Sequence, residues 1–145
     1  MEMEKLLNKL LADLVVEYHK LQSHHWYLRG YHFYDDHPLL NKFYDQVAEM
    51  VDGTAEDMLK LELKPESTMA GFLKISSIKE STNEELDSDA AFRSAYEDYQ
   101  VLRDDVVAVK KAADEQGDYL TSALMDDYIE AVYKQLWMLR QVLKK

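Results

Sequence analysis

The chain has 145 residues and a mass of 17.0 kDa, which is the size of one domain. Its 47% hydrophobic and 31% charged residues exclude intrinsic disorder, and its four glycines and two prolines are too few for a many-stranded barrel or sandwich. It has no cysteine, which excludes disulfides, thiolate metal sites and a cysteine nucleophile, and its net charge of −11 is opposite in sign to that of a phosphate-binding surface.

The first predicted helix runs from about Glu4 to Arg29 and ends at Gly30, because glycine is a natural helix stop. Its apolar residues alternate in steps of four and three, which places them on one helical face: Leu7, Leu11, Leu14, Tyr18, Leu21 and Leu28. His25 occupies the vacant step between the last two of these residues. It is therefore expected on the apolar stripe.

The second predicted helix begins at Pro38, because the first helical position tolerates the missing N–H, and it ends near Leu63. Its apolar face comprises Leu40, Tyr44, Val47, Val51, Thr54, Met58 and Leu61. Residues 65–81 are too many for a tight connection between helices. Within them we expect a short helix over Met69–Ile75, capped by Ser67 or Thr68.

Two further long helices complete the chain. The third begins at a cap formed by Ser88 or Asp89 and ends at Gly117, and the fourth runs from about Tyr119 to Leu143. Their core faces comprise Phe92, Tyr96, Tyr99, Val106, Val109 and Ala113, and then Leu124, Tyr128, Val132, Leu139 and Val142. Short first and last links with one long crossover predict an all-α, ferritin-like four-helix bundle that forms a single domain over residues 1–145.

Ionisable residues on or beside the apolar stripes are the candidates for chemistry. Asp52 and Glu56 are i,i+4 neighbours one step round from the core stripe, in a row that also contains Asn41, Asp45 and Ala48. Two acids this close repel unless a cation or a proton lies between them. The alternative is an ordinary solvated acidic face.

Histidines supply the second set of candidates. His25 on its apolar stripe could instead be a hydrogen-bonded core residue, and His37 could instead cap the second helix. Nothing in the spacing of the other histidines, His19, His24 and His32, places them on an apolar face. Two histidines and two carboxylates together suit non-haem iron, and also zinc or manganese.

The chain contains no Glu-x-x-His sequence, so a standard di-iron centre within one bundle is not expected. The two histidines lie on and just after the first helix, whereas the two acids lie well along the second. A metal site shared by two subunits is therefore attractive.

These residues resemble the Dps family, the ferritin-like mini-ferritins, over nearly the whole chain. The resemblance rests on His25-Trp26-Tyr27-Leu28-Arg29-Gly30, Phe33, His37, Tyr44, Asp52-x-x-Ala55-Glu56, Lys64-Pro65, Ser76-Ser77-Ile78 and Leu136-Trp137-Met138-Leu139. It implies a hollow dodecamer that oxidises Fe²⁺, preferably with H₂O₂, and stores a ferric mineral. It also implies an iron site between subunits related by a two-fold axis.

Carried over to this chain, the resemblance makes His25 and His37 ligands from one subunit and Asp52 and Glu56 ligands from its partner. Trp26 would lie beside the site and take up an electron from a misdirected peroxide reaction. Asn41 departs from the pattern, because many members have an aspartate there that contributes to a second, weaker iron position. Zn²⁺ or Mn²⁺ could occupy the same site.

The acids near the start of the last helix have two interpretations. Acidic side chains at this position stabilise the helix dipole, and the resemblance also matches Asp118 and Asp127 to residues that line iron-admitting three-fold pores. Members of the family often condense DNA through a lysine-rich tail, whereas here only Lys144 and Lys145 follow the last helix. DNA binding is therefore not expected.

The absence of a long apolar run and of a basic amino-terminal segment predicts a cytoplasmic protein with no membrane partner. The function expected is iron storage and detoxification by a ferroxidase that protects against oxidative stress. Two alternatives remain: a nucleoid-associated DNA-binding protein with a vestigial metal site, and an acidic helical interaction module without chemistry.

Overall fold

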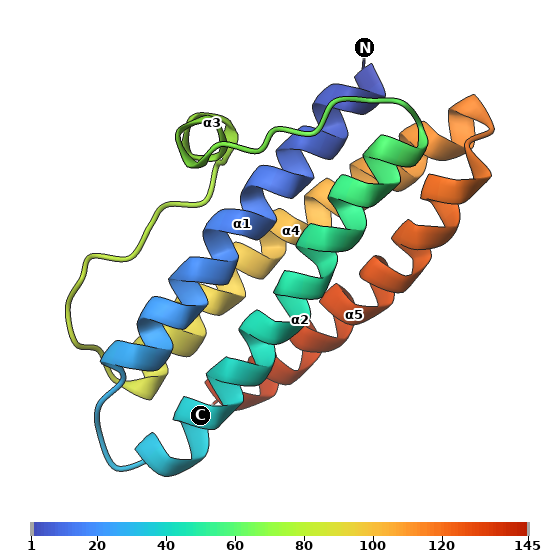
Figure 1. The fold of residues 1–145 in the computed structure, drawn as a ribbon. Helices are drawn as coiled ribbons and strands as arrows, with labels where there is room; N and C mark the ends of the chain where they lie inside the picture. The colour runs from blue at the N-terminus through green and yellow to red at the C-terminus, as the bar shows by residue number, and fades with distance from the viewer. Residues whose placement is uncertain (1, 145) are drawn as a thin grey trace.

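A computed structural model describes residues 2–144 of the chain. Its five helices are α1 (Glu2–Tyr27), α2 (Phe33–Lys60), α3 (Met69–Ile75), α4 (Ser88–Gln116) and α5 (Tyr119–Leu143). The four long helices form a bundle, and the short α3 lies outside it beside α1 (Figure 1). The predicted all-α bundle, with a short helix in the long crossover, is confirmed.

The helices pack as two hairpins, α1 with α2 and α4 with α5, joined by the α1–α4 contact. The crossover between α2 and α4 returns along α1 and is fixed at its far end, where the Leu86 N–H donates to the Tyr27 carbonyl (3.2 Å) and the Arg29 N–H donates to the Leu86 carbonyl (2.9 Å). None of the helices described over residues 2–144 is both long and apolar enough to span a bilayer.

The start of α2 differs from the prediction. The helix begins at Phe33, and Pro38 lies inside it rather than at its first position. A proline this close to the amino-terminal end removes one helical hydrogen bond, to the carbonyl four residues earlier, so the extra turn is tolerated. Because the N-cap residue is His32, His37 is an internal helix residue and the prediction that it could cap α2 is wrong.

The other helix ends follow their local chemistry. Thr68 caps α3 by accepting a hydrogen bond from the Gly71 N–H, as predicted. The cap of α4 is Asp87, one residue before the two predicted candidates. Gly117 ends α4 in the left-handed conformation at φ +69°, which glycine adopts without strain.

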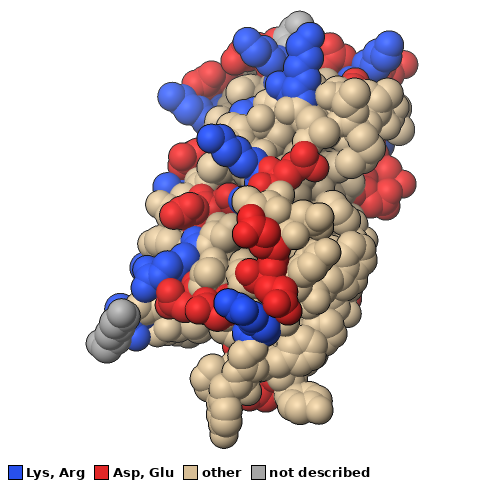
Figure 2. Space-filling model, turned by 90° about the vertical axis from the view of Figure 1, so that its left-hand side faces the viewer, with Lys and Arg blue, Asp and Glu red and all other residues tan. Residues whose placement is uncertain are grey.

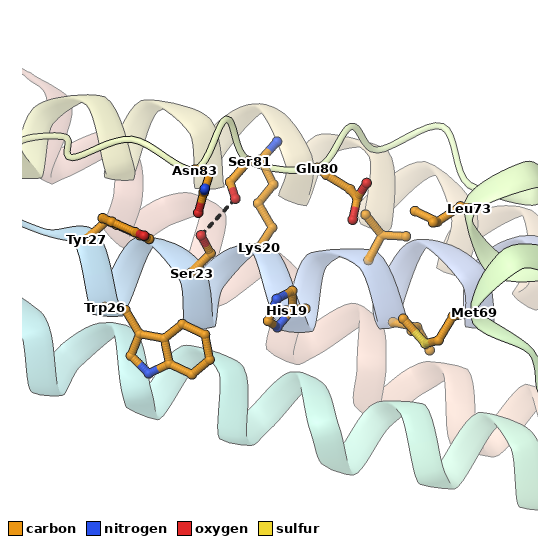
Figure 3. Close-up of a pocket in the computed structure, with 12 residues that line it drawn as sticks. His19, Lys20, Ser23, Trp26, Tyr27, Met69, Leu73, Glu80, Ser81 and Asn83 are labelled. Atoms are coloured by element: carbon orange, nitrogen blue, oxygen red, sulfur yellow. Dashed lines mark hydrogen bonds between the residues drawn. The ribbon is translucent and has the colours of Figure 1, made fainter.

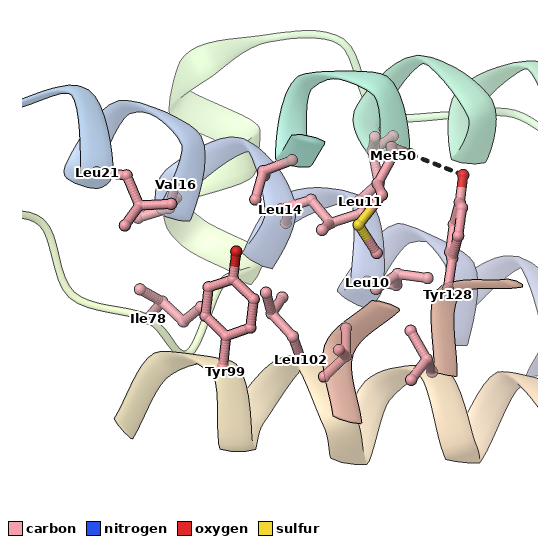
Figure 4. Close-up of a cluster of buried hydrophobic side chains, with 14 of the residues drawn as sticks. Leu10, Leu11, Leu14, Val16, Leu21, Met50, Ile78, Tyr99, Leu102 and Tyr128 are labelled. Atoms are coloured by element: carbon pink, nitrogen blue, oxygen red, sulfur yellow. Dashed lines mark hydrogen bonds between the residues drawn. The ribbon is translucent and has the colours of Figure 1, made fainter. Parts of the chain in front are cut away.

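The predicted apolar stripes form most of the core (Figure 4). The fully buried side chains include Leu7, Leu11, Leu14, Leu40, Val47, Met58, Tyr99, Val106, Val109 and Val132. Tyr18 is only half-buried and packs edge-on against Tyr44, with ring centroids 5.6 Å apart. Val142 was predicted in the core and is instead 54% exposed near the end of α5.

A row of charged side chains lies between α1 and α4, where only apolar residues were expected. We call it the charged seam and define it as Lys9, Asp13, Glu17, Lys20, Asp98 and Asp105. Lys9 pairs with Asp13 and with Asp105 (3.2 Å), and Lys20 pairs with Asp98 (2.9 Å). The seam thus holds four carboxyl groups against two ammonium groups.

Two of these carboxyl groups are forced towards the protonated form. Glu17 is fully buried and both of its oxygens lack a hydrogen-bond partner in the described structure. Burial, reinforced by Asp98, raises its pKa well above the ordinary value. Burial, reinforced by Asp13, raises the pKa of Asp105 to about 8.

The seam also fastens the crossover to the bundle. One carboxylate oxygen of Asp13 accepts hydrogen bonds from the Ser76 hydroxyl (2.7 Å) and the Ser77 N–H (2.9 Å). The Lys9 ammonium donates to the Ser77 hydroxyl (3.0 Å). The segment after α3 is therefore held by the same charges that join α1 to α4.

Candidate metal centre

His25 near the end of α1 and His37 in the first turns of α2 form a stacked pair, with ring centroids 3.6 Å apart and planes 9° from parallel. Each ring bonds to the backbone of the other residue. The His25 Nδ1–H donates to the His37 carbonyl (2.5 Å), and the His37 Nδ1–H donates to the His25 carbonyl (2.7 Å). Because a carbonyl can only accept, both protons are fixed on Nδ1, and each Nε2 keeps its lone pair for a metal.

Aromatic side chains hold both rings in place. Phe33 stacks on His37 with centroids 4.6 Å apart, and the Tyr44 ring meets His25 edge-on at 5.4 Å. His25 is buried, and burial, reinforced by the nearby His37, lowers its pKa. A lowered pKa favours the neutral imidazole, which is the form that binds a metal.

The two acids lie elsewhere on α2. Asp52 and Glu56 are both exposed on the helix surface, and fifteen residues separate His37 from Asp52, or about 22 Å along the helix axis. Among residues 2–144, no three histidine or acidic side chains are grouped so that they could hold one ion. Each chain therefore presents a histidine half-site (His25, His37) and an acidic half-site (Asp52, Glu56) that do not meet.

Asn41 lies between the two half-sites. Its side-chain N–H donates to the Asp45 carboxylate four residues later (2.8 Å). The amide oxygen of Asn41 stays available as a neutral ligand, without the charge that an aspartate would bring.

Trp26 follows His25 directly but points to another surface. Its ring meets His19 edge-on at 5.7 Å, and the side chain is 59% exposed. It lines a cavity of about 280 Å³ between α1 and the crossover, which Figure 3 shows together with Tyr27 and Ser23. The ring contact of Trp26 is thus with His19 and not with His25.

The outer surface of α1 and α2 between the half-sites is apolar. An open groove of about 320 Å³ is lined by Val15, Tyr18, His19, Ala48, Val51 and Met69. Met69 of α3 is 58% exposed at the rim of the groove. Trp26 lies next to the groove, because its ring contacts His19. We call this surface the α1–α2 face.

Comparison with known proteins decides the family. The Ferritin family, described as a ferritin-like domain, matches residues 4–145. The chain is 32% identical over 137 residues to general stress protein 20U of Bacillus subtilis, covering 94% of both chains. It is 30% identical over 135 residues to the DNA protection during starvation protein of Helicobacter pylori, covering 93% of this chain and 94% of that one.

The chain belongs to the Dps family. Its fold superposes on the crystal structure of a Dps protein from Vibrio cholerae O1 with a TM-score of 0.95 and 32% identity, over 99% of this chain and 89% of that one. That protein is described as a member of a broad superfamily of ferritin-like diiron-carboxylate proteins. The resemblance first noted in the sequence of this Dps chain is thus confirmed.

The two acids predicted to line a pore in this Dps chain lie in different settings. Asp118 is the N-cap of α5, where its carboxylate accepts a hydrogen bond from the Thr121 N–H (3.1 Å). Asp127 is exposed on the first part of α5. Its neighbour Asp126 pairs with Lys110 at 2.8 Å. Asp118 therefore has a structural role, as the cap of α5, in addition to carrying a negative charge.

Sequence reasoning missed one buried histidine. His24 was given no place on an apolar face, yet it is only 8% exposed, and burial, followed by the nearby Lys20, lowers its pKa. The available signal was its i,i+4 spacing from Lys20, which continues the charged seam along α1.

Proposed function

We propose that this Dps-family protein oxidises Fe²⁺ at sites shared by two subunits and stores the ferric product inside a hollow dodecamer. Iron storage and protection from oxidative damage are the general roles that membership of the family supports. The observation that carries the finer proposal is the reciprocal bonding of His25 and His37. It presets two neutral imidazoles as ligands on a chain whose acids lie too far away to join them.

A two-fold axis through the α1–α2 face would solve this separation. In such a dimer each contact is made twice with the roles of the chains exchanged. Two α2 helices running in opposite directions would bring the histidine half-site of each chain to the acidic half-site of the other. The apolar groove of the α1–α2 face supports this arrangement, because burying it stabilises association.

The ligand chemistry fits Fe²⁺ as substrate. Two neutral imidazoles and two carboxylates form the mixed nitrogen and oxygen set that non-haem iron prefers, and Zn²⁺ or Mn²⁺ would be accepted as competitors. The protein fixes ligand geometry, and iron carries the redox chemistry. Two Fe²⁺ ions give one electron each to H₂O₂, which takes up two protons and leaves as two water molecules.

Other residues would have subsidiary roles. Trp26 at the rim of the α1–α2 face would give up an electron when a peroxide reaction goes astray. Asp118 and Asp127 would raise the local concentration of Fe²⁺ where it enters the shell. The Fe³⁺ produced then hydrolyses inside the hollow dodecamer. We expect the protein to work in the cytoplasm.

DNA binding is not part of this proposal. The formal charge of −11 per chain opposes approach to a phosphate backbone. On the face shown in Figure 2, acidic and basic side chains are interspersed rather than gathered into a basic patch.

A subunit-mixing experiment tests the shared site. One variant combines His25→Ala and His37→Ala, and the other combines Asp52→Ala and Glu56→Ala. Alone, each variant loses rapid peroxide-driven iron oxidation, because every site lacks half of its ligands. In a mixed dimer one of the two sites is complete, so random co-assembly restores about a quarter of the wild-type sites.

The mixture separates the shared site from any site within one chain. A site built within one chain would stay inactive however the variants are mixed. Absence of recovery in mixed shells, checked by mass spectrometry to contain both variants, contradicts the proposal.

A further inference from the structure

Two side chains of α5 bond to α2 on either side of the acidic half-site. The Tyr128 hydroxyl donates to the Met50 carbonyl (3.1 Å), a contact drawn as the dashed line in Figure 4. On the other side of the half-site, at the residue directly after Glu56, the Thr121 hydroxyl donates to the Asp57 carboxylate (2.6 Å). Both hydrogen bonds are buried, so water does not compete for them.

The spacing of these two bonds matches the register of antiparallel helices. Seven residues separate Thr121 from Tyr128 on α5, and seven separate Met50 from Asp57 on α2, which is two helical turns on each. Between the two points of attachment lie both acids of the half-site. The only other side-chain hydrogen bond between these helices in the described structure is a long one, from Gln135 to Gln46 (3.4 Å).

Gly53 makes the Tyr128 contact possible. A Cβ atom at position 53 would lie 2.3 Å from the Tyr128 hydroxyl oxygen, far inside van der Waals contact. Glycine is a poor residue for the middle of a helix. Its presence between Asp52 and Thr54 is explained by the space that the tyrosine hydroxyl needs to reach the backbone of α2.

We infer that Tyr128 and Thr121 are positioning residues for the acidic half-site, and that Gly53 is there to admit Tyr128. This inference rests on the proposed function, in which the acids must meet histidines of another chain. Ligands that converge from two rigid bodies need supports that fix each body to within a fraction of an ångström. The two bonds from α5 fix the exposed turn of α2 that carries the carboxylates.

The first test removes only the hydroxyl, in the Tyr128→Phe variant of the full-length assembled protein. Zn²⁺ binding under calorimetry is the readout, because it reports ligand geometry without turnover. We expect Zn²⁺ to bind roughly three- to tenfold more weakly, at or below the lower limit of the about 10- to 100-fold losses that follow when direct supports of metal ligands are removed, because Tyr128 supports the backbone and not a ligand itself. Tyr133→Phe is the matched control, since Tyr133 lies on the same helix and is 49% exposed.

The second test is a double-mutant cycle. Gly53→Ala alone displaces the Tyr128 hydroxyl and should weaken Zn²⁺ binding. In the Tyr128→Phe background the same alanine meets nothing closer than the ring carbon at 3.6 Å, which is an ordinary contact. The double variant should therefore bind Zn²⁺ like Tyr128→Phe alone, and additive losses would contradict the inference.

Thr121 provides an independent pair of variants should Tyr128→Phe fail to assemble. Thr121→Ser keeps the hydroxyl and should bind Zn²⁺ like the wild type, whereas Thr121→Val should weaken binding. Wild-type affinity in both Tyr128→Phe and Thr121→Val overturns the inference, and so does an equal loss in Tyr133→Phe.

Asp52→Ala distinguishes this inference from the proposed function. If Asp52→Ala leaves Zn²⁺ binding unchanged, the proposed site itself is wrong. If Asp52→Ala abolishes binding while Tyr128→Phe binds like the wild type, only the positioning role is wrong.

Discussion

The charged seam makes a direct prediction for the Glu17→Gln variant. Glu17 is fully buried beside Asp98, and its raised pKa means that the folded protein keeps a proton there that the unfolded chain releases above its ordinary pKa of 4.5. Glutamine has nearly the same shape and carries no charge. Its side-chain N–H group can donate to the Asp98 carboxylate as a protonated glutamate would, beside the ion pair that Asp98 makes with Lys20 at 2.9 Å.

The sign of the effect follows from proton counting. Above pH 4.5 the folded state binds more protons than the unfolded state, so the wild-type free energy of unfolding falls as pH rises towards the folded pKa. Each such group contributes a decline of at most about 1.4 kcal/mol per pH unit. Glu17→Gln removes the contribution of residue 17. The free energy of unfolding of the variant should therefore rise relative to that of the wild type by up to about 1.4 kcal/mol for each pH unit.

Denaturant unfolding between about pH 5 and pH 9 measures this difference. Both proteins are compared at one concentration, because assembly also stabilises the folded chain. Glu130→Gln, an exposed glutamate on α5, is the control and should run parallel to the wild type. Asp105→Asn should likewise reduce the fall in the free energy of unfolding with pH, since burial raises the pKa of Asp105 to about 8. Parallel curves for Glu17→Gln and wild type would show that Glu17 is ionised in the fold.

Four further predictions concern iron, the cap of α5 and DNA. Asn41→Asp should tighten a second Fe²⁺ position by adding a negative ligand, and a wild-type protein that already titrates with two equally tight ions per site would contradict this. Asp118→Ala should destabilise the fold by about 1 kcal/mol through loss of the α5 cap. Asp118→Asn should keep the cap and slow only iron uptake, and Asp127→Asn should also slow iron uptake. Unchanged uptake in stopped-flow assays would show that neither residue lines a pore. Plasmid DNA should not be retarded in gels without divalent cations, even at low salt, where screening weakens and the Debye length exceeds about 10 Å. Retardation that grows as the salt concentration falls would reveal a basic surface.

The long helices could be predicted because each carries an unbroken apolar stripe with a period of 3.6 residues. The start of α2 could not, because proline suits both the first position of a helix and its first turns. The ring fixes the φ of Pro38 near the helical value and hinders only the turn before it, and the exposed Tyr34 and Asp35 can begin the helix without contacting the core. Whether α2 begins at Pro38 or earlier depends on the preceding loop, where Gly30 has a φ of +119° and lets the chain turn ahead of Phe33.

The residue types of the candidate site can be read from the sequence, but their arrangement cannot. His25 and His37 are twelve residues apart on different helices, and their reciprocal bonds depend on how the hairpin closes. The charged seam was missed because acids and lysines on a helix are normally assigned to the surface. The 13-17-20 spacing of Asp13, Glu17 and Lys20 contained the signal, since it places them on one face beside the apolar stripe.

The two half-sites are held by separate parts of the fold, so the proposed shared site should fail in two different ways. The histidine half-site is closed by the backbone carbonyls of its own hairpin, so any change that leaves the end of α1 and the start of α2 in place should leave the two imidazoles preset. The acidic half-site depends instead on α5, through Tyr128 and the space at Gly53. Loosening α5 should therefore lower the metal affinity of both sites in the proposed dimer without changing either pair of histidines, whereas a change at His25 or His37 should remove ligands and leave the acids fixed.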